Sequence, residues 1–224
     1  MKKRFLYFFG VIIGILFVLS LTLFPTKARK LNGMWRAALN SPQGSITFYS
    51  TLQEGEDISE NVNEYEYEKR SDGFYYKSTS YSIEEDGTRT LNRIFESFED
   101  GQKIAFDGEP PQEIPSDVST TPTTNLKNVI GGAWRELNRS NVKNIQVEKG
   151  DSETVYYVEF ASKYKESEAG TLNSNVLFFF TKSTMTVTYS EQEKRIKKIE
   201  QMNTGLKNST EHVPVSAHYI LIFE

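Results

Sequence analysis

The stretch EYEYEKRSDGFYYKSTSYSI, residues 64–83, decides the fold of this chain. Its first five residues alternate acidic and aromatic side chains, which is the pattern of a strand with one buried and one solvated face. Ser71-Asp72-Gly73 then supplies turn residues, and Phe74–Ile83 is typical of the returning strand of a hairpin. The stretch therefore predicts antiparallel β-structure.

Further turns extend this hairpin along the chain. Glu85-Asp86-Gly87 and Glu99-Asp100-Gly101 each precede another β-forming segment, and Ile46–Ser50 alternates before the hairpin. Strands joined by such short turns form an antiparallel meander. Residues 46–108 are therefore expected to make a first β meander.

A second run of β-forming segments occupies residues 139–224. Within it, Asn175–Thr181 and Thr184–Tyr189 are predicted to be two strands, and Tyr219–Phe223 is predicted to be the last one. Residues 190–204 fit either a helix that begins with a capping box or another strand. The strand is favoured because both neighbouring segments are β-forming.

One helix is predicted before each meander. Apolar residues fall at helical spacing within Ala28–Leu39 and again within residues 125–138. Each helix contains one of the two tryptophans, Trp35 and Trp134, and we expect each indole to dock its helix on a sheet. Residues 109–124 hold four of the seven prolines and are expected to form a loop.

The N-terminal segment predicts where the protein works. Residues 5–24 contain no charged side chain, and a bilayer core about 30 Å thick is spanned by roughly 20 apolar helical residues. They are predicted to be a transmembrane signal-anchor in the cell membrane, with residues 1–4 inside the cell and 25–45 forming a juxtamembrane segment and helix. The alternative is a signal peptide cleaved near Ala28, which would yield a secreted protein. Residues 31–224 are expected to form a single extracytoplasmic domain.

Charge is unevenly distributed along the chain. The first thirty residues hold six of the 26 Lys and Arg and none of the 30 Asp and Glu, so residues 31–224 carry 20 basic and 30 acidic side chains. An acidic domain repels nucleic acid, so no nucleic-acid partner is expected. The absence of Cys excludes disulfides, thiol catalysis and acylation of a lipoprotein. A basic cluster, expected to be charge-balanced on a solvated face or to touch anionic headgroups, comprises Lys194, Arg195, Lys197 and Lys198.

No catalytic or metal-binding motif is present in the sequence. The two histidines, His212 and His218, accompany no nucleophile motif and match no usual metal-ligand spacing. Glu64, Glu66 and Glu68 share one strand face, where they are expected either to be solvated or to form an acidic patch for a basic partner. We therefore predict a protein that is not an enzyme and that uses no cofactor and no metal.

Aromatic side chains are frequent on the predicted strands. Some of them are expected to fill the core, and burying one contributes roughly 1.5–3 kcal/mol. The remainder could line a concave apolar groove that contacts a ligand or partner. The candidate residues for this role are Trp35, Tyr65, Tyr67, Phe95, Phe98, Trp134, Phe178 and Phe180.

The order helix, meander, helix, meander resembles the LolA/LppX-like group of bacterial envelope proteins. The segments that match are Ala28–Leu39, Ile46–Asp107, Asn125–Leu137 and Asn144–Phe223. The resemblance implies an α+β fold in which a mainly antiparallel, curled, half-barrel-like sheet has two short helices packed on one face and binds lipid or another apolar group. The chain departs from that group in two ways, because it has no lipobox Cys and because a tethered protein cannot ferry cargo.

We therefore expect a membrane-anchored extracytoplasmic binding protein of a bacterial envelope, which presents a concave β-sheet to a protein or lipid-like partner. A looser resemblance to TipC-type exported immunity proteins implies a first alternative, an immunity protein that neutralises a secreted toxin. A second alternative is a structural subunit of an envelope secretion or conjugation machine.

Overall fold

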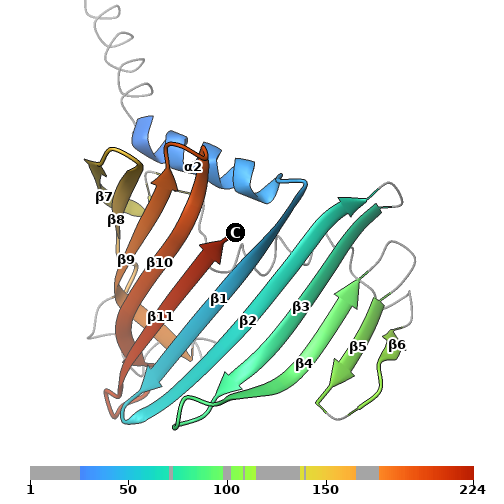
Figure 1. The fold of residues 1–224 in the computed structure, drawn as a ribbon. Coiled ribbons are helices and arrows are strands. Elements are labelled where there is room, and N and C mark those ends of the chain that lie inside the picture. The colour runs from blue at the N-terminus through green and yellow to red at the C-terminus, as the bar shows by residue number, and fades with distance from the viewer. Residues whose placement is uncertain are drawn as a thin grey trace, which may run out of the picture.

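The chain is described here from a computed structural model, shown as a ribbon in Figure 1. The described residues are 26–70, 73–97, 102–107, 109–114, 137–138, 140–164 and 177–224. Among them, no helix is both long enough and apolar enough to cross a bilayer. The predicted transmembrane segment, residues 5–24, lies outside the described residues.

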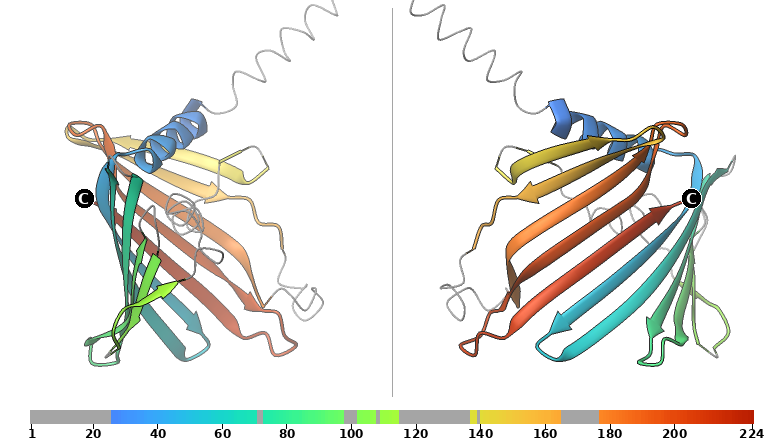
Figure 2. Two further views of the ribbon diagram at one scale, coloured as in Figure 1. Left: turned by 90° about the vertical axis from the view of Figure 1, so that its right-hand side faces the viewer. Right: turned by 60° about the vertical axis from the view of Figure 1, so that its left-hand side comes forward.

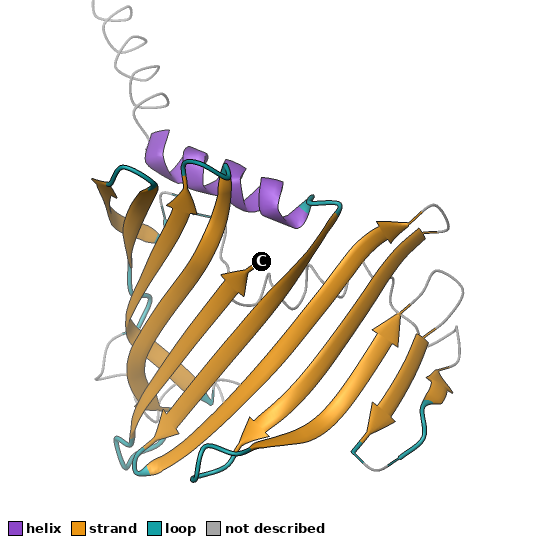
Figure 3. Cartoon of the chain, viewed as in Figure 1, coloured by secondary structure: helices purple, strands orange, loops and turns teal. Residues whose placement is uncertain are grey.

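The described residues form a helix and an antiparallel sheet of eleven strands (Figure 3). The helix is α2, Thr26–Leu39. The strands are β1 (Gln43–Glu54), β2 (Asp57–Arg70), β3 (Gly73–Ile83), β4 (Arg89–Ser97), β5 (Gln102–Phe106), β6 (Gln112–Ile114), β7 (Val142–Lys149), β8 (Glu153–Phe160), β9 (Phe178–Ser190), β10 (Arg195–Lys207) and β11 (Pro214–Phe223). Their order in the sheet is β6-β5-β4-β3-β2-β1-β11-β10-β9-β8-β7.

The two meanders are joined through β1 and β11, the first and last described strands in sequence. β1 and β11 pair antiparallel from Ile46 opposite Phe223 to Glu54 opposite Val215. This β1–β11 seam places the first meander, β1 to β6, on one side and the second, β7 to β11, on the other. The sheet curls strongly and stays open, with β6 and β7 as its edges (Figure 2). The expected half-barrel-like, mainly antiparallel sheet is therefore confirmed.

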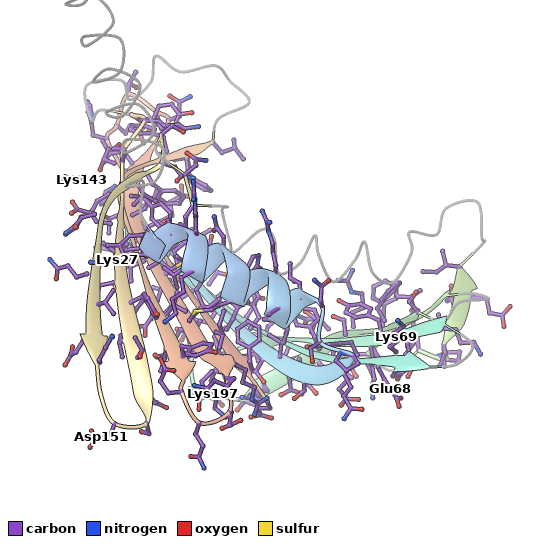
Figure 4. All side chains as sticks on the ribbon, turned by 90° about the horizontal axis from the view of Figure 1, so that it is seen from above. Lys27, Glu68, Lys69, Lys143, Asp151 and Lys197 are labelled. Carbon is purple, nitrogen blue, oxygen red and sulfur yellow. The ribbon has the colours of Figure 1, made fainter. Side chains whose placement is uncertain are left out.

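Helix α2 packs against the concave face of this sheet. Its apolar side chains are fully covered, with Leu31 at 0% and Trp35 at 6% exposure, and the Trp35 ring meets Phe223 edge-on at a centroid distance of 6.3 Å. Asn32 adds two hydrogen bonds to the backbone of Leu137, donating to its carbonyl at 2.9 Å and accepting from its N–H at 3.0 Å. Seen from above, the helix lies in the angle between the two wings of the sheet (Figure 4).

The concave face beneath α2 forms the hydrophobic core. Alternate residues of each strand point to this face, so Ile46, Tyr65 and Phe223 face the helix while their neighbours in sequence face outward. At the N-terminal end of α2, Lys27 Nζ donates a hydrogen bond to the carbonyl of Ile145 on edge strand β7, at 3.1 Å. The buried core continues through Tyr76, Tyr156, Val158, Met185, Val187, Ile196, Ile199 and Leu221.

The structure refines several sequence expectations. Residues 195–202 belong to strand β10, which confirms the strand interpretation over the helix. β9 is one continuous strand from Phe178 to Ser190, where two strands were expected. Gln112–Ile114 forms the short edge strand β6 inside the segment expected to be a loop, because it pairs with β5. The second predicted helix lies almost entirely outside the described residues, so only one of the two helices is observed.

A bulge between β9 and β10 requires glycine at position 205. The register between these strands shifts between Thr204 and Gly205, and the two backbones approach closely there. A Cβ on Gly205 would collide with the carbonyl oxygen of Phe179 and lie 2.7 Å from the Cα of Phe180. Since backbone cannot move aside as a flexible side chain does, no other residue fits without displacing β9.

We expect Gly205→Ala to lower the free energy of unfolding by about 1–3 kcal/mol because of this overpacking. Gly33→Ala is the matched control, since a Cβ there meets nothing within 4 Å on the exposed side of α2. Replacing a helical Gly by Ala stabilises by up to about 1 kcal/mol. Thermal unfolding of the detergent-solubilised full-length protein would check both, and an unchanged midpoint for Gly205→Ala would contradict the bulge geometry.

Candidate ligand pocket

A pocket of about 350 Å³ opens on the concave face, beside the core. Its floor comes from β9, β10 and β11, and its wall from the chain that leaves β8 and enters β9. The turn between β9 and β10 lies next to α2 (Figure 1), and the pocket residues of β10 follow Ile196 and Ile199 along the strand. The pocket therefore occupies the part of the concave face that α2 leaves open.

The wall of the pocket is aromatic. Tyr164 packs on Phe179 with ring centroids 5.9 Å apart, and Phe179 is 1% exposed. On the far side, Tyr219 stacks on Phe48 with centroids 5.9 Å apart, and burial raises the pKa of its hydroxyl. The aromatic residues that line the pocket are Phe160, Tyr164, Phe178, Phe179, Phe180 and Tyr219.

The floor of the pocket is polar and uncharged. Gln201 and Asn203 lie two positions apart on β10 and so share a face, and Gln201 Nε2 donates to Asn203 Oδ1 at 3.0 Å. Asn203 is 3% exposed. Ser183 lies opposite Asn203 on β9. Among the described residues that line the pocket, Lys163 alone carries a charge, and its side chain is exposed.

Two of the eight aromatic candidates from the sequence line this pocket, namely Phe178 and Phe180. Trp35, Tyr65 and Tyr67 are 5–6% exposed and belong to the core around α2, so the geometry gives them a packing role and does not support ligand contact. Phe95 packs on the core, with its ring centroid 6.1 Å from that of Tyr76. Phe98 and Trp134 lie outside the described residues.

The acidic candidates lie on the opposite face of β2. Glu64, Glu66 and Glu68 alternate with the buried tyrosines, as the sequence pattern predicts. Glu64 Oε1 pairs with Arg89 Nη1 at 3.1 Å, and Glu66 lies directly across from Lys77 on β3. The described structure thus pairs one of these carboxylates with a basic side chain and places another across from one, and their role as an acidic partner patch stays a prediction.

The basic cluster at the start of β10 is charge-balanced. Lys194 pairs with Glu191 at 3.2 Å, and Lys198 pairs with Glu200 at 2.7 Å. Glu193 accepts from both Arg195 and Lys197, at 2.6 and 2.8 Å. The hydrogen bond that Glu191 accepts from Thr154, followed by the one from Lys194, lowers the pKa of that carboxyl, and hydrogen bonds from the neighbouring basic side chains lower the pKa of Glu193 and Glu200. Local pairing therefore accounts for the cluster.

The histidines lie away from the pocket. His218 Nε2 is 2.8 Å from Glu200 Oε1 on the convex face, and His212 lies in the turn before β11. Among the described residues, no group of three or more His, Asp or Glu side chains is placed to hold a metal ion. The pocket itself offers no carboxylate–histidine pair among its described lining residues.

The sequence reasoning missed the residues of the pocket floor. Gln201, Asn203 and Ser183 continue the inward-facing series that includes Ile199 and Met185 nearer to α2. Polar residues at inward-facing positions of a strand are the signal that could have identified them. These positions can be identified as inward-facing only once the register of β9 and β10 is known.

No family model and no curated protein sequence matches this chain. Among solved structures, it is similar to LprF from Mycobacterium bovis, with 8% identity over 89% of this chain and 92% of that one and a TM-score of 0.35. It is also similar to a putative outer membrane lipoprotein-sorting protein domain from Vibrio parahaemolyticus, with 12% identity, coverage of 87% and 91% and a TM-score of 0.27. A third similar structure is a DUF1329 family protein from Desulfovibrio piger, with 10% identity over 89% of this chain and 91% of that one and a TM-score of 0.29. At TM-scores this low, the half-barrel assignment rests on the sheet and helix described above.

Buried tyrosines of the core make the free energy of unfolding depend on pH in the alkaline range. Burial raises the pKa of Tyr76 from 10.0 to about 12 and also raises that of Tyr65. The unfolded chain ionises these hydroxyls near their ordinary pKa while the folded chain keeps them protonated, so their stabilising contribution is complete below pH 10 and is lost as pH rises toward 12. We expect Tyr76→Phe to make this decline shallower in urea unfolding between pH 9 and about 12. An equally steep decline in the variant would contradict the assignment.

Proposed function

We propose that this chain is a non-enzymatic binding protein of a bacterial envelope, whose concave pocket holds the apolar part of a lipid-like ligand. The observation that carries the proposal is the pocket itself, an aromatic wall beside a polar floor in about 350 Å³. Ligand sites are typically concave, mostly apolar and furnished with a few placed polar groups, in volumes of roughly 300–1,000 Å³. An amphiphile meets both surfaces at once.

The chemistry of the pocket supports binding over catalysis. General acid–base catalysis needs a titratable group within hydrogen-bond reach of the reacting atoms. The described residues that line the pocket contain Lys163, Tyr164 and Tyr219 as titratable groups and no carboxylate or imidazole. The closest carboxylate–histidine arrangement, Glu200 with His218, lies on the other face of the sheet.

We place the protein at the cell membrane, with residues 5–24 as the anchor and the N-terminus inside. Helix α2 begins two residues after that segment, contains no acidic residue, and exposes Arg29, Lys30 and Arg36. Basic side chains next to a bilayer attract anionic headgroups. Ala28, near the alternative cleavage site, is 1% exposed in the core, which supports retention of the segment, because cleavage there would remove the first turn of α2.

The two other functions expected from the sequence stay predictions. The immunity-protein alternative relied on an acidic surface, and two of its three glutamates face basic side chains of this same chain. The alternative of a secretion- or conjugation-machine subunit relied on general architecture. Neither gains support from a particular contact among the described residues.

A photocrosslinking experiment would test the proposed function. The full-length protein would be reconstituted into phosphatidylcholine vesicles that contain a phosphatidylcholine with a diazirine on one acyl chain. We expect crosslinked peptides from residues 5–24, which contact the bilayer, and additionally from residues 160–164 and 178–183, which contain much of the pocket lining. Peptide mass spectrometry after irradiation would locate both groups.

Two variants make this measurement specific. Phe180→Asp places a charge in the apolar wall and should strongly reduce crosslinking at the pocket while crosslinking at residues 5–24 persists. Met202→Asp is the matched control, because Met202 is 52% exposed on the opposite face of β10, between Gln201 and Asn203. Crosslinks confined to residues 5–24 in the wild-type protein would refute lipid binding by the pocket.

A further inference from the structure

We infer that the pocket selects a neutral amphiphile whose polar end carries a hydroxyl or amide group, recognised by the carboxamides of Gln201 and Asn203. This inference rests on the proposed function and names the ligand class for the same pocket. Its starting point is the hydrogen bond from Gln201 Nε2 to Asn203 Oδ1 at 3.0 Å on the pocket floor.

That bond leaves part of each carboxamide available. Within the described residues, the NH₂ group of Asn203 and the carbonyl oxygen of Gln201 make no other hydrogen bond. If both amides were turned over, one NH₂ group and one carbonyl would still remain, so the result does not depend on how they are assigned. The pocket floor thus presents a donor and an acceptor side by side.

The burial of Asn203 makes these hydrogen-bonding groups important for ligand selection. Asn203 is 3% exposed, so a ligand group that hydrogen-bonds to it is largely shielded from competing water. A ligand group that both donates and accepts, such as a hydroxyl or an amide, can pair with both carboxamides. A purely accepting group, such as an ester, can use only the NH₂ side.

Neighbouring strands add hydroxyl groups on the same face. Ser183 lies across from Asn203 on β9, and Tyr219 lies across from Gln201 on β11. Cross-strand neighbours on one face have Cβ atoms about 4.5–5.5 Å apart. The four side chains therefore form a compact hydrogen-bonding floor, which faces the phenylalanines of the wall across the pocket.

The charge of the pocket favours a neutral head group. Lys163 is the single charged residue among its described lining residues, and its side chain is exposed at the edge. An anionic group held against Asn203 would lose its hydration without gaining a buried cationic partner, which is costly. A cationic group would find no carboxylate among the same residues.

The test compares three photoactivatable probes that share one diazirine-bearing acyl chain. They are a monoacylglycerol, which is neutral with free hydroxyls, the methyl ester, which is neutral without a donor, and the free fatty acid, which is anionic. Each is mixed at equal content into phosphatidylcholine vesicles that hold the full-length protein. The yield of crosslinked peptide from residues 178–183 is the readout, normalised to the yield from residues 5–24.

We expect the monoacylglycerol to label the pocket about fivefold more than the methyl ester, as one or two additional hydrogen bonds would give. Asn203→Leu should bring this ratio close to one, and Ser183→Ala, a milder change at the same floor, should reduce it. Met202→Leu on the opposite face should leave the ratio unchanged. A wild-type ratio near one would overturn the inference while leaving lipid binding intact.

The remaining outcomes are equally distinct. Preferential labelling by the free fatty acid, lost in Lys163→Gln, would show that the head group is anionic and would overturn the inference. A ratio that persists in both Asn203→Leu and Ser183→Ala would also overturn it, because selectivity would then arise elsewhere. Absence of pocket labelling by all three probes would refute the proposed function itself.

Discussion

The antiparallel pairing of β1 with β11 is the interaction on which the rest of the structure depends. It joins the strand that follows α2 to the last strand of the chain, with Ile46 opposite Phe223. Without it the two meanders would be separate sheets, each with another open edge. With it they form one wide sheet whose twist accumulates from strand to strand until the sheet curls. Because the pairing joins residues far apart in sequence, the sheet is completed only when the C-terminal strand is available.

The curl produces two different zones on the concave face. Near α2, the inward side chains are apolar and are covered by Leu31 and Trp35. Farther along β9 and β10 they become polar, at Ser183, Gln201 and Asn203, and the helix no longer covers them. The pocket lies at the boundary between these zones, where a molecule with an apolar and a polar part satisfies both. The bulge at Gly205 belongs to the same region, since it sets the position of the Phe178–Phe180 backbone.

Local patterns predicted much of this fold. The alternation at Glu64–Glu68 identified both the strand and its buried face, because Tyr65 and Tyr67 are covered and the glutamates are not. The helical spacing of Leu31 and Trp35 correctly predicted that α2 docks through its indole. The first part of β10 was harder to assign, since apolar residues at 196, 199 and 202 fit a helix as well as a strand. Neighbouring strands decided the assignment.

The pocket could not be predicted, because it depends on long-range register. Gln201 and Asn203 are ordinary surface residue types, and only pairing with β9 and β11 shows that they face inward. The aromatic candidates present the opposite difficulty. Tyr65 and Trp35 have chemistry that suits a ligand, but the packing of α2 on the sheet buries them in the core, so their ligand role stays a prediction. Sequence composition identifies which side chains favour burial and does not distinguish a core from a groove.

The most direct test of this account is a disulfide across the β1–β11 seam, which is feasible because the chain contains no native Cys. Ser45 and Glu224 exchange both backbone hydrogen bonds, so Leu52 and Ala217, seven positions along each strand, form a non-hydrogen-bonded pair. Their Cα atoms are then about 4.5 Å apart, within the range of a disulfide.

The double variant Leu52→Cys/Ala217→Cys should oxidise readily and resist alkylation by a maleimide. The control Leu52→Cys/Asn203→Cys uses the next residue in the same cross-strand row, two strand spacings or roughly 9.5 Å away, and should stay reduced. Oxidation of the first pair alone is the result that the account predicts. Oxidation of the control, or free thiols in the first pair, would contradict it.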